Sequence, residues 1–371
     1  MSTKNLVIKS SLIWILSKIS ILFFSYMSLW MLSKNEARDL KFKQLIDEFW
    51  NLNIWNKWDV KWYLQIAENG YLVANTESNV SFFPGFPLLI KVLNYLPVNT
   101  IQAGFIVSFI GGLIGVIYLN KLAILEGDKN FTTIMVWIFA PMSIFLFLPY
   151  SESLFCGFCF SAWYFGKKNY WIMAGVMSFF ASTVRVNGIF LATALLVMFI
   201  FSKKQNWVKG IPILLGFLPI ILYFTFLKSK FGSWFIWFEV QEKFWQRKFT
   251  NPVESLKNSL LRTKIIEYDA SWLIQNRIEI FCVFVLIIFA LYFLVNKMWP
   301  EFIFIFTNLA AITTSSFWWT TPRSMLAILP IWLLIGKFLS ERIIVKMTYF
   351  IFSIPIFTIS AIAFMMGRPV N

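Results

Sequence analysis

The sequence predicts an all-α polytopic membrane protein, because it is strongly apolar, rich in aromatic residues and poor in charge. Of its 371 residues, 58% are apolar or aromatic and 14% are charged, whereas soluble globular proteins have about 45–50% apolar and about 25% charged residues. The mean hydropathy is +0.69, and 43 Phe and 18 Trp exceed what one water-soluble core could bury. This composition excludes a soluble enzyme, a disordered chain and a peripheral protein with one anchor.

About eleven segments are apolar enough to cross a bilayer, which needs roughly 20 mostly apolar residues per helix. We expect the first to be a retained span and not a cleaved signal, because Lys18 interrupts it and no small-residue cleavage site follows. The predicted spans are Leu12–Leu32, Ile101–Tyr118, Phe131–Pro149, Leu154–Gly166, Tyr170–Thr183, Gly188–Ser202, Ile211–Leu227, Ile278–Val295, Phe302–Phe317, Ser324–Leu339 and Thr348–Met366.

Lysine and arginine in the short loops predict the orientation, because positively charged short loops stay in the cytoplasm. With the N-terminus inside, the even-numbered loops carry most of these charges, so the net charge of +15 indicates topology and not a nucleic-acid partner. The long hydrophilic segments 33–91 and 228–277 then form two outer loops around an extracytoplasmic site. We expect residues 1–371 to form one integral membrane domain in a bacterial plasma membrane, although an endoplasmic reticulum bilayer would also suit this charge pattern.

The residue inventory restricts the chemistry that an outer site could perform. The sequence contains no His, which leaves carboxylates as the natural proton acceptors. It also lacks an Asp-x-Asp motif and the glycine-rich loops with which many proteins bind nucleotides. No cofactor is certain, but Mg²⁺ or Mn²⁺ stays possible, since both prefer oxygen ligands. The three Cys lie in apolar stretches and imply no disulfide framework.

The first outer loop begins with a predicted amphipathic helix over Glu36–Trp55. Its apolar side chains recur at helical spacing, and its aromatic residues suit the headgroup plane of a membrane. Such a helix is either a structural brace or a floor beneath a lipid-borne substrate, and the sequence leaves both open. The apolar face comprises Phe42, Leu45, Ile46, Phe49 and Leu52.

Six motifs, in order along the chain, resemble one known family. Residues 58–71 read Trp-Asp-x-x-Trp-Tyr-Leu-x-Ile-Ala-x-x-Gly-Tyr, and residues 82–87 read Phe-Phe-Pro-x-x-Pro. The later motifs are Tyr-x-Glu-Ser-Leu-Phe at 150–155, Thr-x-Arg-x-Asn-Gly at 183–188, Phe-Glu-Val-Gln-Glu at 238–242 with Trp245 and Arg247, and Thr-Pro-Arg at 321–323. Together they resemble the PIG-V-like (GPI mannosyltransferase II-like) family and its bacterial relatives. Gly85 departs from the pattern, which has a bulkier residue there.

The resemblance implies a GT-C-type bundle that transfers a hexose, such as mannose, from a polyprenyl phosphate to an acceptor hydroxyl with inversion. An attacking hydroxyl needs a base, and the resemblance favours Asp59 in that role, between Trp58 and Trp62, whose rings could stack on sugars. From the residues alone, Asp59 is equally a helix N-cap for Val60–Asn69. The two roles can coexist.

The leaving phosphate needs fixed positive charge, and Arg185 and Arg323 are the candidates because they stand at predicted outer helix ends, where a charge is costly unless it is paired or functional. Arginine suits bidentate phosphate contacts, but each of these residues could instead snorkel or pair with Glu152. Glu152 is a candidate to orient Arg185, bind sugar hydroxyls or ligate a metal, although an acid in the first turn of a helix is ordinary. The remaining candidates for substrate binding are Tyr63, Tyr71, Phe83, Tyr150, Asn187, Gln241, Glu242, Arg247 and Trp319.

Two other interpretations of the function stay open. A transporter or flippase of a lipid-linked sugar could use the same aromatic and arginine residues, but transport does not require two long outer loops. A non-catalytic subunit of a transferase complex is the other, and the presence of Asp59 argues against it. The expected partners are the bilayer, a polyprenyl-phosphate-linked sugar and a glycolipid, glycan or protein acceptor. The sequence does not specify the sugar, the acceptor, metal dependence or oligomeric state.

Overall fold

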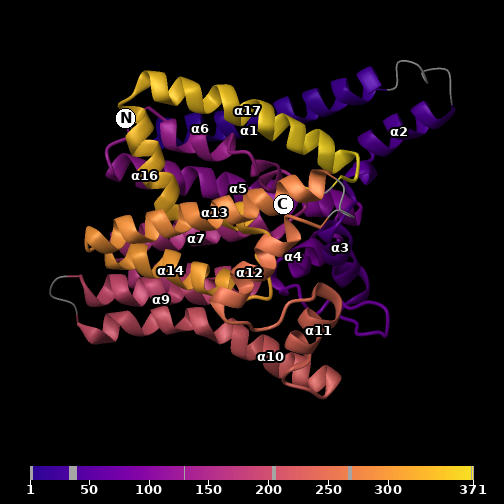
Figure 1. Ribbon diagram of the computed structural model, residues 1–371. Coiled ribbons are helices and arrows are strands. Elements are labelled where there is room, and N and C mark those ends of the chain that lie inside the picture. Colours follow the sequence, from indigo (N-terminus) through magenta and orange to yellow (C-terminus); the bar gives the residue numbers. More distant parts are fainter. Residues whose placement is uncertain are drawn as a thin grey trace. The chain divides into compact units, whose positions relative to one another are not determined.

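The computed structural model describes residues 3–32, 40–128, 130–202, 206–265, 270–368 and 370. These residues form helices and contain no β-strand, only two isolated bridges between single residues. The helices, drawn in Figure 1, are α1 Thr3–Leu32, α2 Leu40–Trp50, η1 Asn53–Trp55, α3 Asp59–Asn69, α4 Gly85–Leu93, α5 Thr100–Leu125, α6 Thr132–Ile138, η2 Ser143–Leu146, α7 Ser151–Lys167, α8 Trp171–Val184, α9 Gly188–Ile200, η3 Trp207–Phe217, α10 Leu218–Phe231, α11 Ile236–Trp245, α12 Pro252–Arg262, α13 Ala270–Val295, α14 Trp299–Thr313, α15 Thr321–Met325, α16 Leu329–Ser340 and α17 Ile343–Met365.

Five helical segments of the described chain are long and apolar enough to cross a membrane: Lys4–Trp30, Thr100–Leu125, Trp207–Phe231, Trp272–Val295 and Ile343–Met365. Four shorter apolar helices accompany them, namely α8, α9, α14 and α16. The prediction of an all-α polytopic membrane protein is therefore confirmed, and the total of eleven spans stays a prediction. Both long hydrophilic segments contain helices, as predicted: α2 and α3 in the first, α11 and α12 in the second.

Two predicted spans are interrupted by non-helical residues, and a proline accounts for each interruption. The predicted span Phe131–Pro149 contains α6, a turn and η2, because Pro141 has no N–H for the carbonyl of Trp137 four residues earlier. The hydroxyl of Ser143 donates to that carbonyl instead. The predicted span Ser324–Leu339 divides into the end of α15 and α16, and Pro330 lies in the first turn of α16, where its missing N–H costs nothing.

The predicted amphipathic helix Glu36–Trp55 was too long. The helix α2 ends at Trp50, and Leu52 adopts a left-handed backbone with φ 64° before the short η1 begins. Asparagines on both sides of Leu52 favour this end, because their side chains compete for backbone hydrogen bonds and disfavour helix interiors. Residues 33–39, and with them the predicted helix start, lie outside the described residues, as does the side chain of Phe42.

The described chain divides into two compact units, each assembled from separated segments. Unit 1 falls in Met1–Glu68, Pro87–Gly157 and Trp332–Val370, and unit 2 in Asn69–Phe86 and Phe158–Ile331. The single domain expected from the sequence stays a prediction.

Unit 1 is built on α1, which packs against α5, α6 and α17. Trp14 is fully buried in this core, where its Nε1 donates to the carbonyl oxygen of Phe109 at 3.1 Å and its ring stacks on Trp137 with 6.5 Å between centroids. Gly112 makes this packing possible, since a β-carbon there would overlap the Trp14 ring. The helix α5 thus gains a groove that accepts the tryptophan.

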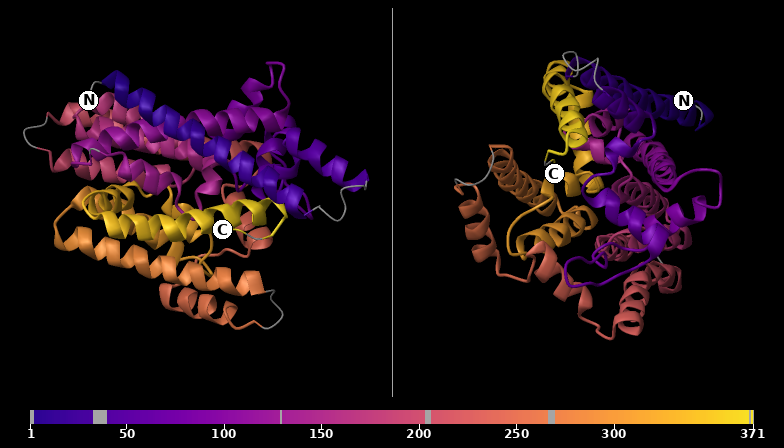
Figure 2. Two further views of the ribbon diagram at one scale, coloured as in Figure 1. Left: turned by 90° about the horizontal axis from the view of Figure 1, so that it is seen from above. Right: turned by 90° about the vertical axis from the view of Figure 1, so that its right-hand side faces the viewer.

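Unit 2 places α8 against η3 and α9 against α14, and Figure 1 shows α9 running beside the η3–α10 rod. Glycines allow backbones to meet closely: a β-carbon on Gly175 would overlap the carbonyl of Pro212, and one on Gly216 would overlap the hydroxyl of Ser178. The helix α12 lies alongside α13 (Figure 2). The second outer loop is therefore attached to the helical body of its unit.

Candidate functional site

Asp59 lies in the first turn of α3 and is half-buried. Trp58 precedes it with a left-handed backbone, φ 56°, which turns the chain into the helix. The backbone N–H of Asp59 donates to the hydroxyl of Tyr150 at 3.3 Å. A carboxylate at this end of a helix is favoured by the helix dipole, so the position suits both a stabilising first-turn acid and a reactive carboxylate.

A buried polar contact joins α3 to the start of α7. The hydroxyl of Tyr63 donates to Oγ of Ser151 at 2.8 Å, and the rings of Tyr63 and Tyr150 meet edge to face with 6.2 Å between centroids. Glu152 follows directly and is 1% exposed. Unit 1 therefore brings together three of the predicted site residues, Asp59, Tyr63 and Tyr150, and Glu152 stands in the first turn of α7 directly after Ser151.

The two tryptophans that flank Asp59 differ in exposure. The Trp58 side chain is 42% exposed, while that of Trp62 is half-buried. The ammonium group of Lys61 lies 4.4 Å from the centroid of a Trp62 ring, a cation–π distance. Both rings keep accessible surface, as a stacking platform for a sugar would require.

In unit 2, Arg185 and Asn187 occupy the break between α8 and α9. Arg185 ends α8 with an extended backbone, φ −150° and ψ 148°, which turns the chain toward α9. Nδ2 of Asn187 donates to Oδ1 of Asn308 on α14 at 2.7 Å. The structure thus uses the Asn187 amide to join α9 to α14, a contact between residues 121 positions apart.

Tyr71 and Phe83 lie in a cluster that anchors the end of the first outer loop within unit 2. The hydroxyl of Tyr71 donates to the carbonyl of Phe82 at 2.7 Å, and Phe83 is 4% exposed with its ring 4.8 Å from that of Tyr223. The Tyr223 hydroxyl donates to the carbonyl of Val80 at 2.6 Å. These contacts give both predicted residues a packing role.

Gly85 has a steric reason for departing from the family pattern. A β-carbon at this position would lie 2.5 Å from Oγ1 of Thr183 and 2.9 Å from its carbonyl oxygen. The start of α4 and the end of α8 therefore approach each other more closely than any larger residue would allow.

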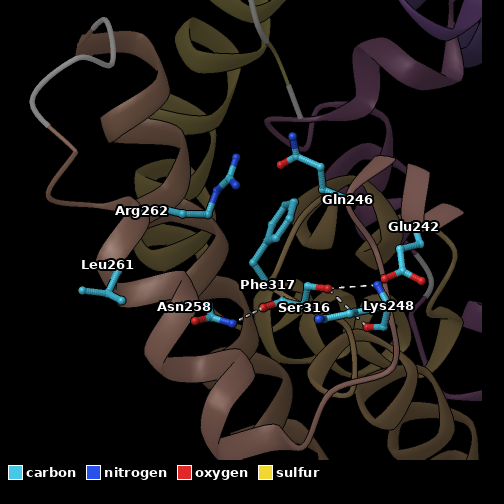
Figure 3. Close-up of a pocket in the computed structure, with 8 residues that line it drawn as sticks. All are labelled: Glu242, Gln246, Lys248, Asn258, Leu261, Arg262, Ser316 and Phe317. Atoms are coloured by element: carbon cyan, nitrogen blue, oxygen red, sulfur yellow. Dashed lines mark hydrogen bonds between the residues drawn. The ribbon is translucent and has the colours of Figure 1, made fainter. Parts of the chain in front are cut away.

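Residues of the second outer loop, together with Ser316 and Phe317, line an open cavity of about 440 Å³ within unit 2, shown in Figure 3. The guanidinium carbon of Arg262 lies 3.9 Å from the ring centroid of Phe317. Nδ2 of Asn258 donates to the carbonyl of Ser316 at 3.0 Å, and the backbone N–H of Lys248 donates to Oγ of Ser316 at 2.9 Å. The cavity is lined by Glu242, Gln246, Lys248, Asn258, Leu261, Arg262, Ser316 and Phe317.

Three other predicted residues, Gln241 and Arg247 of this loop and Trp319, lie close in the chain to residues that line the cavity. Gln241 and the cavity residue Glu242 belong to α11, and the carbonyl of Gln241 accepts a hydrogen bond from the backbone N–H of Arg247 at 2.9 Å. Trp319 stacks on Trp272 with 5.3 Å between centroids and 16° between planes. Cations, amides and an aromatic face are therefore combined at this end of unit 2.

Arg323 is 7% exposed and belongs to the short helix α15. Sequence reasoning missed the residue that holds the start of this helix, Glu279 of α13. Its two carboxylate oxygens accept the backbone N–H groups of Thr320 and Thr321 at 2.8 and 2.7 Å. An acid inside an apolar span was the available signal, because such residues are rare and commonly functional.

A metal site can be tested against the acidic residues. Among the residues that the structure describes, no three Cys, Asp or Glu side chains gather in a way that could hold an ion. Magnesium commonly uses one or two protein carboxylates together with substrate phosphates. A metal role for Glu152, and the use of Mg²⁺ or Mn²⁺, therefore stay predictions.

The described helices define a polytopic membrane protein, in which unit 1 holds a carboxylate, Asp59, at a helix start and unit 2 holds Arg185 and Arg323 at helix ends. Residues 3–209, more than half of the chain, match the family described as Mannosyltransferase (PIG-V). The chain belongs to this family, which confirms the resemblance seen in its motifs.

The chain is similar to curated members of this family over part of their length. It is 29% identical over 147 residues to GPI alpha-1,6-mannosyltransferase 2 of Cricetulus griseus, and 30% identical over 145 residues to the protein of that name of Homo sapiens; each alignment covers 36% of this chain and 29% of the relative. GPI mannosyltransferase 2 of Schizosaccharomyces pombe is 27% identical over 142 residues, 37% of this chain and 30% of the relative. The chain thus spans less than a third of these relatives. No solved structure matches it significantly.

Proposed function

We propose that this chain is a GT-C-type glycosyltransferase that moves mannose, or a related hexose, from a polyprenyl phosphate to an acceptor hydroxyl with inversion. The supporting observation is the position of Asp59, a half-buried carboxylate in the first turn of α3 whose backbone is bonded to the buried Tyr150. The membership of the mannosyltransferase family and the apolar spans support the same function. The site would face the extracytoplasmic side of a bacterial plasma membrane, with the N-terminus in the cytoplasm, as the loop charges predict.

In the proposed reaction the acceptor oxygen attacks the anomeric carbon while Asp59 takes the hydroxyl proton. The bond between that carbon and the phosphate oxygen breaks, and the phosphate leaves with the electron pair. Arg185 and Arg323 would stabilise the negative charge that develops on it. Glu152 would orient the sugar or a metal ion. The acceptor would be a glycolipid, a glycan or a protein.

The direct test incubates purified protein with labelled polyprenyl-phosphate mannose and a panel of acceptors. Asp59→Asn should lower the rate of label transfer by about 100- to 10,000-fold, the usual contribution of a general base. Asp47→Asn is the matched control, because Asp47 is an exposed acid on α2 in the same loop and should leave the rate unchanged. An arm with EDTA tests metal dependence.

The outcomes separate the alternatives. Transfer at the wild-type rate by Asp59→Asn would remove Asp59 from the role of base. Movement of labelled donor across proteoliposomes without any glycosylated product would favour a flippase. If the wild type neither transfers nor moves the donor, but a partner protein restores transfer in which Asp59 has no effect, the chain is a non-catalytic subunit.

A further inference from the structure

Glu279 is a buried acid for which the proposed reaction has no use. It belongs to α13, inside the apolar span Trp272–Val295, and is 1% exposed. A carboxylate in such a place is costly unless it is fully engaged. Both of its oxygens are engaged, one by the N–H of Thr320 and the other by the N–H of Thr321. The carboxylate therefore accepts hydrogen bonds from the backbone of two successive residues.

The first of these residues has a strained backbone. Thr320 adopts a left-handed conformation with φ 64°, which is a genuine outlier for a β-branched residue. Strain of this kind persists only where the surrounding structure enforces it, and it gathers at functional sites. The two hydrogen bonds to Glu279 hold the backbone of Thr320 in this left-handed conformation. Directly after it, Thr321 and Pro322 begin α15, and Arg323 follows.

The same segment is also held from the second outer loop. The backbone N–H of Trp318 donates to Oγ of Ser259 on α12 at 2.8 Å, and the N–H of Thr250 donates to the carbonyl of Thr314 at 2.8 Å. Glu279 in addition interacts electrostatically with Arg247. Residues 314–321 are therefore fixed between α13 and the outer loop, and Arg323 is carried by the end of this fixed segment.

We infer that Glu279 is a positioning residue: it holds Thr320 in the left-handed conformation and thereby sets the direction in which Arg323 meets the donor phosphate. This inference rests on the proposed function, in which Arg323 binds that phosphate. It assigns the buried acid of α13 to the donor site, although Glu279 itself touches no substrate.

The test measures binding of undecaprenyl phosphate to the full-length protein in micelles, with undecaprenol as the control for the phosphate. Glu279→Gln should raise Kd by about 10- to 100-fold, since glutamine has one acceptor oxygen for two N–H groups and hydrogen bonds to charged groups are worth this much. Glu301→Gln is the matched control, because Glu301 is a buried acid of the neighbouring α14 that pairs with Lys167 at 2.9 Å. It should leave Kd unchanged.

Two further variants distinguish positioning from a general loss of structure. Thr320→Gly should restore most of the affinity in the Glu279→Gln background, because glycine adopts positive φ without strain and needs no enforcement. Arg323→Gln should weaken binding as strongly as Glu279→Gln, and the double variant should be no weaker than Arg323→Gln alone, since residues that act through one contact are not additive. A merely structural role for Glu279 would give neither result.

The outcomes distinguish a failure of the proposed function from a failure of the positioning role of Glu279. If the wild type does not prefer undecaprenyl phosphate to undecaprenol, the proposed donor is wrong and the inference falls with it. If the wild type has this preference and Glu279→Gln keeps the same Kd, only the inference is overturned. If Glu279→Gln is poorly folded and Thr320→Gly restores its thermal stability without restoring affinity, Glu279 supports the fold alone and the inference is again overturned.

Discussion

The hydrogen bond between Tyr63 and Ser151 should measurably stabilise the attachment of α3, which carries Asp59, to α7. The donor and acceptor are 2.8 Å apart and both residues are buried. A neutral intramolecular hydrogen bond contributes about 0.5–1.5 kcal/mol net. Tyr63→Phe and Ser151→Ala should therefore each destabilise the protein, and their double-mutant cycle should give a coupling energy of about 1 kcal/mol.

Chemical denaturation of the purified protein in mixed micelles measures the four free energies of unfolding that the cycle needs. The control cycle combines Tyr63→Phe with Ser28→Ala, since the hydroxyl of Ser28 donates to the carbonyl of Ser25 in its own helix. These two changes should add within about 0.5 kcal/mol. A coupling energy near zero for Tyr63 and Ser151 would refute the reasoning. The rate of label transfer by Tyr63→Phe should also fall, by up to about 10-fold for each 1.4 kcal/mol that the change adds to the activation free energy.

Three further changes test contacts within unit 2. Gly85→Ala should lower the free energy of unfolding by about 1–3 kcal/mol, because its β-carbon overlaps Thr183; an unchanged denaturation midpoint would contradict this close approach. Asn187→Ala should cost about 1 kcal/mol by removing the bond to Asn308, and an unchanged KM for the donor would show that Asn187 only joins helices. Lys167→Met should cost about 1.5–3 kcal/mol, because it removes the cation from the Glu301 carboxylate, which is 8% exposed; adding Glu301→Gln should recover part of this loss in the same denaturation assay.

Local sequence signals predicted the all-α polytopic membrane fold, because the length of an apolar segment indicates whether it can cross a bilayer; the total of eleven spans stays a prediction. They failed where a proline interrupts an apolar stretch, as Pro141 does, since hydropathy does not register a missing N–H. They also failed at Leu52, where two asparagines end a helix whose apolar periodicity continues past them. Backbone hydrogen bonding, and not hydrophobicity, determines these ends.

The sequence suggested candidate site residues where they are neighbours in one motif, but it did not suggest contacts between residues that are far apart in the chain. Asp59, Trp58 and Trp62 stand together in one motif, and the structure keeps them at the start of α3. The partner of Asn187 is 121 residues away and that of Glu279 is 41 or 42 residues away. No sequence pattern pairs residues that are so far apart, so the contacts of these two side chains can be seen only in the folded structure.

The bond from Tyr223 to Val80 has a consequence for biosynthesis on the ribosome. Its two ends are separated by 143 residues, and a ribosome adds about 5–20 residues per second. The stretch around Val80 is therefore synthesised roughly 7–30 s before its partner Tyr223 on α10. During that interval its apolar side chains have no partner from this helix, so the nascent chain depends on the insertion machinery or on lipid to shield them until translation reaches Tyr223.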